Sequence, residues 1–151
     1  MLYISTIHST NFNILIVAMG DVITEIKFGT LRANDLPENA TTIECKRQLE
    51  EYFNGTRKEF DVEYWYHGTE FQEKVWKAIS TIPYGETITY KQLAEKIGAP
   101  NAVRAVGNAC NSNMLAILLP CHRVVNANGT LSSYQAGPEI KKMLLDLEKR
   151  G

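Results

Sequence analysis

The residues of this chain that are best suited to chemistry are Cys121 and His122, which are neighbours in the run Pro120-Cys121-His122-Arg123-Val124. An imidazole that takes the proton of a thiol leaves a nucleophilic thiolate, and the charged imidazole then lowers the thiol pKa. Adjacent side chains of an extended chain point to opposite sides, so His122 would reach Cys121 across a turn or through a water molecule. The alternative is a small core cysteine beside a structural histidine, and the surrounding sequence has to decide between the two.

The remaining cysteines and histidines indicate neither a disulfide framework nor a metal site. Cys45, Cys110 and Cys121 form no CxxC pair and leave an odd cysteine, which fits a reducing cytoplasm. The three histidines are far apart and lack metal-ligand spacing, so we predict no metal and no cofactor. The sequence has no apolar run of membrane-spanning length and no basic signal region. No membrane partner is therefore expected, and the predicted location is cytoplasmic.

Charge is distributed unevenly along the 151 residues, which carry a net charge of −1. Residues 1–66 hold 10 acidic and 6 basic side chains, whereas residues 67–151 hold 7 acidic and 10 basic ones. No acidic residue lies between Asn101 and Tyr134, so a surface built there could approach phosphates without repulsion. A polar, weakly charged face without such a ligand is the alternative.

The first part of the chain is predicted to be a small sheet with a helix packed on it. Gly20-Asp21 supplies a tight turn among runs rich in Ile and Val, which predict strands over residues 2–7, 13–19 and 22–28. A loop is expected over residues 29–40. A helix is expected from about residue 42 to residue 53, and Cys45 occupies one of its apolar positions, as a core residue. No chemistry is predicted in this part.

The second part is predicted to be mostly helical. Two Thr-x-x-Gln capping boxes, at residues 69–72 and 89–92, predict helices over residues 69–80 and 89–97. Gly98 ends the second of these helices, and Pro100 suits the start of another, expected over residues 100–111. Two short helices joined by a turn that contains glycine are typical of a helix-turn-helix.

The helix expected over residues 100–111 divides into three stripes. The apolar stripe, which should face the core, contains Val103, Val106 and Cys110. A second stripe has only small side chains, Ala102, Ala105 and Ala109, and a third is polar, with Arg104, Asn108 and Asn111. A stripe of small residues permits close approach either of another helix or of a DNA groove. The adjacent arginine and asparagines favour the groove.

The segments on either side of Cys121 are predicted to support it. The five apolar residues 115–119 are expected to form a buried strand that Pro120 ends, because proline has no N–H to donate to a sheet. The last helix is expected to begin at Gly137-Pro138 and to bury Ile140, Met143, Leu144 and Leu147. Glu148 lies at the edge of that apolar stripe, so it either points inward at a buried cation or remains a solvated acid.

Five segments resemble, in their order and separations, the O6-alkylguanine-DNA alkyltransferases, also called methylated-DNA–protein-cysteine methyltransferases. They are Ile82-Pro83-Tyr84-Gly85, Thr89-Tyr90-Lys91-Gln92-Leu93-Ala94, Arg104-Ala105-Val106-Gly107, Pro120-Cys121-His122-Arg123-Val124, and Leu144-Leu145 with Glu148. The resemblance covers about residues 69–150, whereas residues 1–60 match only in layout. It implies an α+β fold with a small ribonuclease H-like sheet-and-helix domain over residues 1–66. A mostly helical, winged-helix-like domain over residues 67–151 would bind DNA and accept the alkyl group.

The resemblance implies a catalytic role for five residues. Cys121 would attack the alkyl carbon on guanine O6, or on thymine O4, and keep the group as a thioether, so that each molecule acts once. His122 would be the base, acting through a water, and Glu148 would hold and charge the imidazole, by the logic of a Ser-His-Asp triad. Tyr90 would hydrogen-bond to the guanine ring and offset the charge on the leaving base. Asn113 would brace the active-site turn.

The resemblance also implies contacts to the substrate. The partner would be double-stranded DNA that carries O6-alkylguanine, bound by a monomer through the minor groove, with the damaged base flipped out. Arg104 would enter the stack where the base was, and the other DNA contacts would come from Ala102, Ala105, Asn108, Ala109 and Arg123. The substrate-binding loop would contribute Ser132, Ser133, Tyr134 and Gln135.

Three positions depart from the usual pattern of this family. Met114 stands where proline is common, Ser132 where glycine is common, and Gln135-Ala136 where small or basic residues and glycine are usual. These departures leave the chemistry intact, but they leave open the conformation of the loop and the largest alkyl group accepted. Serine adds a Cβ and disfavours positive φ, so a methyl group should be accepted more readily than a benzyl group.

Three other functions remain open on the sequence. An alkyltransferase-like damage sensor would bind lesions without repair, but such proteins lack the acceptor cysteine that Cys121 supplies. A winged-helix transcription factor would use the helix-turn-helix without needing Cys121, His122 or Glu148. A cysteine hydrolase would need an Asn or Asp to complete its triad, and none is evident. Mass spectrometry after mixing with methylated DNA distinguishes these functions, because only the alkyltransferase gains one methyl group.

Overall fold

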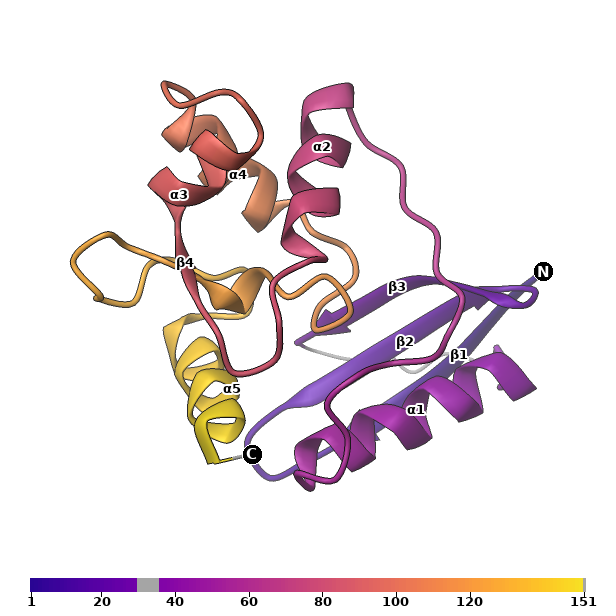
Figure 1. The fold of residues 1–151 in the computed structure, drawn as a ribbon. Coiled ribbons are helices and arrows are strands. Elements are labelled where there is room, and N and C mark those ends of the chain that lie inside the picture. Colours follow the sequence, from indigo (N-terminus) through magenta and orange to yellow (C-terminus); the bar gives the residue numbers. More distant parts are fainter. Residues whose placement is uncertain (30–35, 151) are drawn as a thin grey trace. The chain divides into compact units, whose positions relative to one another are not determined.

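A computed structural model describes residues 1–29 and 36–150 of the protein. The chain forms two compact units: Met1–Tyr66 together with Met114–Ala116, and His67–Asn113 together with Ile117–Gly151 (Figure 1). The sequence predicted domains over residues 1–66 and 67–151, and the return of residues 114–116 to the first unit was not predicted. Residues 30–35 of the loop predicted over residues 29–40 lie outside the described residues.

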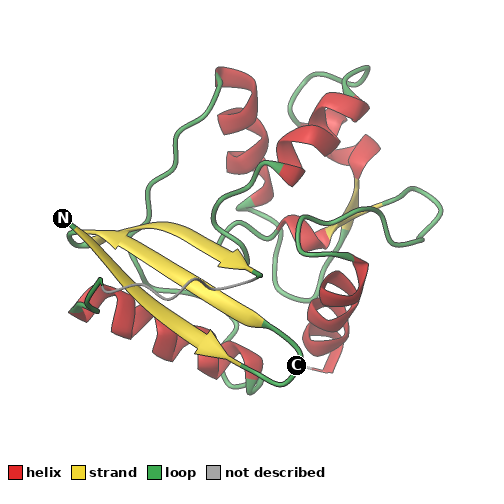
Figure 2. Ribbon diagram, turned by 180° about the vertical axis from the view of Figure 1, so that it is seen from behind, coloured by secondary structure: helices red, strands yellow, loops and turns green. Residues whose placement is uncertain are grey.

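The first unit is a three-stranded antiparallel sheet with one helix across it. The strands β1 (Leu2–His8), β2 (Asn13–Met19) and β3 (Val22–Phe28) pair in the order β1-β2-β3, with a β-bulge at Val17/Ala18. Helix α1 (Ala40–Phe53) packs on one face of this sheet (Figure 2). Most of the apolar side chains of β2 and several of β3 are buried, together with Cys45 of α1, so the core role predicted for Cys45 is confirmed.

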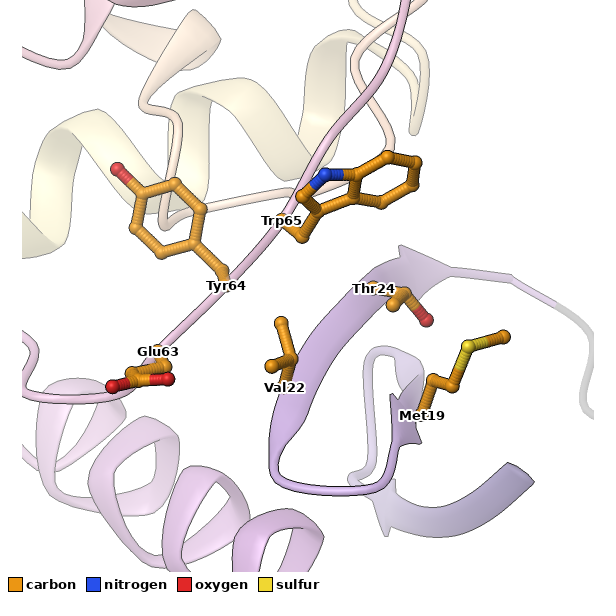
Figure 3. Close-up of a pocket in the computed structure, with 6 residues that line it drawn as sticks. All are labelled: Met19, Val22, Thr24, Glu63, Tyr64 and Trp65. Carbon is orange, nitrogen blue, oxygen red and sulfur yellow. The ribbon is translucent and has the colours of Figure 1, made fainter. Parts of the chain in front are cut away.

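The outer edge of β3 is covered by two short segments of the same unit. Ile23 donates its N–H to the carbonyl of Glu63 at 2.9 Å and accepts from the N–H of Trp65 at 2.9 Å. Further along β3, Ile26 pairs in the same way with residues 114–116. A pocket of about 460 Å³ opens at this edge, lined by Met19, Val22, Thr24, Glu63, Tyr64 and Trp65 (Figure 3). None of these six belongs to the predicted site.

The second unit is mostly helical. It contains α2 (Glu70–Ile79), α3 (Tyr90–Lys96), α4 (Val103–Asn111), a 3₁₀ turn η1 (Cys121–Arg123) and α5 (Pro138–Arg150). The strands β4 (Ile88–Thr89) and β5 (Val124–Val125) pair in parallel. Both predicted capping boxes are present, at Thr69 with Gln72 and at Thr89 with Gln92. No described helix is long and apolar enough to cross a membrane.

Two expected elements of this unit differ from the structure. Helix α4 begins at Val103, after a turn at Pro100, so Val103 is 38% exposed at the first position instead of facing the core. Residues 115–119 form no continuous strand, because the backbone turns at Ile117, which has a φ of 73°. A β-branched residue is rarely found in this region of φ, so tertiary contacts hold the segment in its turn.

Candidate active site

The turn η1 presents Cys121, His122 and Arg123 in three different directions. A 3₁₀ helix has three residues per turn, so successive side chains diverge by about 120°. All three are buried, and Cys121 is 2% exposed. The chain therefore turns at this point, which was one of the two possibilities left open by the sequence, and neighbouring residues can enter separate environments.

Glu148, from the end of α5, joins two of these residues. The Nε2 atom of His122 lies 2.6 Å from Oε2 of Glu148. The guanidinium of Arg123 donates to the two carboxylate oxygens of Glu148 at 2.8 and 3.0 Å. The backbone N–H of Gly85 also donates to Oε1, at 3.2 Å. The Glu148 side chain is 1% exposed. Of the two alternatives that the sequence left open for Glu148, the structure has the inward one, and the buried cation is Arg123.

The partners of His122 determine which of its nitrogens can act as a base. A carboxylate only accepts hydrogen bonds, so Nε2 carries the proton and Nδ1 keeps its lone pair. Nδ1 is buried, and it has no hydrogen-bond partner within residues 1–29 and 36–150. Burial lowers the pKa of His122 and outweighs Glu148, which raises it. Burial therefore favours the neutral imidazole at rest, and the role of Glu148 in charging it stays a prediction.

The thiol of Cys121 is held in a dry environment beside Asn113. Burial raises the pKa of Cys121 well above its ordinary value, so the resting thiol is neutral. The Nδ2 atom of Asn113 donates to the sulfur at 3.2 Å and to the carbonyl of Leu119 at 2.8 Å. The first of these hydrogen bonds lowers the thiol pKa. Asn113 thus lies beside the active-site turn, where it was predicted; its contribution to catalysis stays a prediction.

A lysine that the sequence did not single out lies between Ser132 and β5. The Nζ atom of Lys141 donates to the carbonyl of Val124 at 2.6 Å and to the hydroxyl of Ser132 at 2.7 Å. The hydroxyl of Tyr90 lies 2.6 Å from the same serine oxygen. Lys141 is fully buried. It precedes Leu144 by three residues, so it lies on the buried face of α5, and that spacing was the available signal.

The other predicted loop residues are more exposed. Ser133 and Gln135 are exposed, and the hydroxyl of Ser133 lies 3.4 Å from the Nδ2 donor of Asn111. Tyr134 is half-buried, and burial raises the pKa of its hydroxyl. The described residues contain no group of three or more side chains that could hold a metal.

Two of the residues predicted to contact DNA do not reach the surface. On α4, Arg104, Ala105 and Asn108 are exposed and Ala102 is half-buried. Ala109 is 2% exposed, and its carbonyl accepts a hydrogen bond from the indole of Trp76 at 2.8 Å. Its place in a DNA-facing stripe is therefore wrong, because it packs against α2. The side chain of Arg123 is 8% exposed and holds Glu148, so its predicted DNA contact is wrong as well.

Comparison with known proteins gives the family of each unit. The family described as "6-O-methylguanine DNA methyltransferase, DNA binding domain" matches residues 70–150, and its "ribonuclease-like domain" matches residues 2–64. A methylated-DNA–protein-cysteine methyltransferase of Mycobacterium leprae is 45% identical over 141 residues, which cover 90% of this chain and 86% of that protein. One from Methanosarcina acetivorans is 56% identical over 105 residues, covering 70% and 67%.

A solved structure agrees with these relatives. The crystal structure of Mycobacterium tuberculosis OGT in complex with DNA superposes with a TM-score of 0.90 at 42% identity, covering 98% of this chain and 93% of that one. Both family domains match in order, and the relatives are similar over most of their length. The chain belongs to the 6-O-methylguanine DNA methyltransferase family.

Proposed function

We propose that this protein repairs DNA by moving the alkyl group of O6-alkylguanine, and of O4-alkylthymine, irreversibly to its own Cys121. Relatives named methylated-DNA–protein-cysteine methyltransferase, and a relative solved in complex with DNA, support this reaction class. The observation that carries the assignment to Cys121 is the buried His122–Glu148 contact of 2.6 Å in the turn that holds the thiol. The reaction needs no cofactor, because acceptor and base both come from the chain.

The proposed reaction begins from a neutral thiol and a neutral imidazole. His122 takes up the thiol proton at Nδ1, through a water, while Glu148 stabilises the imidazolium that forms. The sulfur then bonds to the alkyl carbon as the bond from that carbon to O6 breaks, and the electron pair moves onto the guanine. Tyr90 donates a hydrogen bond to the departing base, and the proton held by His122 restores neutrality to the products. Asn113 stabilises the thiolate through its 3.2 Å hydrogen bond to the sulfur.

The exposed part of α4 is proposed to bind the duplex. Arg104 and Asn108 are exposed there beside the small side chain of Ala105, which allows close approach to a groove. A buried thiol cannot reach a base within the helix stack, so the damaged base has to flip out. Arg104 would then occupy the gap in the stack. We also infer that one copy of the chain acts alone and that it works in a reducing, cytoplasmic environment.

Mass spectrometry tests the proposal. The protein is mixed with a duplex that contains one O6-methylguanine, and the expected product is protein with one added methyl group on the peptide that contains Cys121. Cys121→Ser should bind the same duplex without gaining the group, and Cys45→Ala, a thiol removal in the other unit, should gain it normally. Lesion binding by the unchanged protein without any transfer would instead indicate a damage sensor, and a label on Cys110 or repeated turnover would refute the assignment.

A further inference from the structure

We propose that Ser132 is a positioning residue that links the ammonium of Lys141 to Tyr90 in a chain of hydrogen-bond donors, which stabilises the negative charge on the departing guanine. The inference rests on the proposed function and deepens it, because it adds Ser132 to the step in which the base leaves. It concerns the second unit alone, and Ser132 is one of the positions at which this chain departs from its family.

The direction of each hydrogen bond follows from the chemistry of the groups. An ammonium only donates, so Ser132 accepts from Lys141 at 2.7 Å. The hydrogen of Ser132 then has two acceptors to choose from: Tyr90 Oη at 2.6 Å and the carbonyl of Ser133 at 3.4 Å. The shorter contact is the better hydrogen bond. Tyr90 then accepts from Ser132, and its own hydrogen is directed away from the serine and is available to a base.

The burial of Lys141 supports a functional role rather than a packing role. Placing an ammonium in an apolar interior costs free energy, and burial lowers the pKa of Lys141 to about 8. A methionine would fill the same space without that cost. The ammonium lies 5.7 Å from the centre of the Tyr90 ring, so its charge is close to the phenol.

The titratable groups that face the ammonium come from three elements. They are Tyr90 of α3, Cys110 of α4, and Cys121 and His122 of η1. Below pH 8 the lysine is charged. Its charge then also favours the thiolate of Cys121. A test must therefore separate an effect on the thiol from an effect on the leaving base.

The chain of donors acts at a defined moment of the reaction. When the bond from the alkyl carbon to O6 breaks, the electron pair leaves with the guanine, and Tyr90 donates to the base as it becomes negative. Each donor in the chain polarises the next, so the charge of Lys141 strengthens the hydrogen bond that Tyr90 gives. The proton balance is unchanged, because His122 still holds the thiol proton until the products separate.

Single-turnover rates of methyl transfer from duplex O6-methylguanine at pH 7 test the proposed chain of hydrogen-bond donors. Removing a direct donor of this kind costs ~100-fold or more in rate, so we expect a loss of about tenfold for Ser132→Ala and a larger one for Lys141→Met. The double variant should be no slower than Lys141→Met, because both changes break one chain. Ser132→Thr keeps the hydroxyl and should recover most of the rate. Lys142→Met, an exposed neighbour on α5 paired with Asp146, should react as the wild type does.

Two further measurements distinguish this role from a structural one. Methylation of Cys121 by methyl iodide needs no donor for its leaving group, so Ser132→Ala should react with it at the wild-type rate. The ratio of the wild-type rate to the Lys141→Met rate for O6-methylguanine should fall toward one above pH 8, because a neutral lysine adds no charge. Additive losses, or an equal loss with methyl iodide, would overturn the inference while leaving the proposed function intact. Failure of the wild type to accept any methyl group from DNA would overturn the proposed function itself.

Discussion

Replacing Lys141 by methionine should change how the stability of the protein depends on alkaline pH. Burial lowers the pKa of Lys141 from 10.5 to about 8 in the folded chain, whereas lysine keeps its ordinary value in the unfolded chain. Between these two values the unfolded chain binds more protons, so the free energy of unfolding of the wild type rises with pH relative to that of Lys141→Met. The difference in pKa corresponds to about 3 kcal/mol once the whole window is crossed.

Urea unfolding at a series of pH values from 7 to 10.5 measures this effect. The hydrogen bonds lost in Lys141→Met shift its stability by the same amount at every pH, so only the change with pH carries information. We expect the wild type to gain about 3 kcal/mol over the variant across the series, with most of the gain above pH 8. Lys142→Met, which removes a 66% exposed lysine, is the control and should show no such gain. A constant difference between wild type and Lys141→Met would refute the idea that burial lowers the pKa of Lys141 in the folded chain.

Three substitutions test the rest of the site. Glu148→Gln should lower the free energy of unfolding by ~3–5 kcal/mol, because it leaves the buried Arg123 without a counter-charge. Its transfer rate should also fall, since an amide can donate to His122 and fix the wrong tautomer; the remaining activity should extend to lower pH, because Glu148 raises the pKa of that histidine. Arg104→Ala should slow transfer from duplex DNA more than transfer from a single strand, and equal rates on both would argue against a role in base flipping. Ser132→Gly should raise the ratio of O6-benzylguanine to O6-methylguanine reaction rates, and an unchanged ratio would remove the steric argument.

Local signals in the sequence were sufficient for most of the elements. Runs rich in Ile and Val around the Gly20-Asp21 turn placed the three strands of the first sheet, and two capping boxes placed α2 and α3. The strand predicted over residues 115–119 was wrong, because a short apolar run does not distinguish a strand from a buried turn. The turn at Ile117 depends on contacts that are distant in sequence. The pair β4 and β5 has two residues in each strand, too few for a periodic pattern.

The site was predictable where a residue type has one common use. The spacing of α5 left Glu148 either inward or solvated, and the family resemblance alone gave it a role beside His122; the structure places it inward. Arg123 was assigned to DNA because it is one of two cations in a stretch without acids, and only the structure pairs it with Glu148. Lys141 was not singled out, because a lysine is rarely fully buried. Ala109 was misplaced because small residues suit both helix packing and groove contact. In the structure the indole of Trp76 donates a hydrogen bond to the carbonyl of Ala109, so this residue packs against α2.

The position of Glu148 near the end of α5 has a consequence for local order. Helix ends ordinarily fray, and their amide hydrogens exchange quickly with solvent. This end is held by His122, by the guanidinium of Arg123 and by the N–H of Gly85, so it opens only if a buried ion pair separates. Each such opening also releases the imidazole from its fixed tautomer. Hydrogen exchange in the last turn of α5 would therefore report the fraction of molecules in which the imidazole is released and the base is not ready to act.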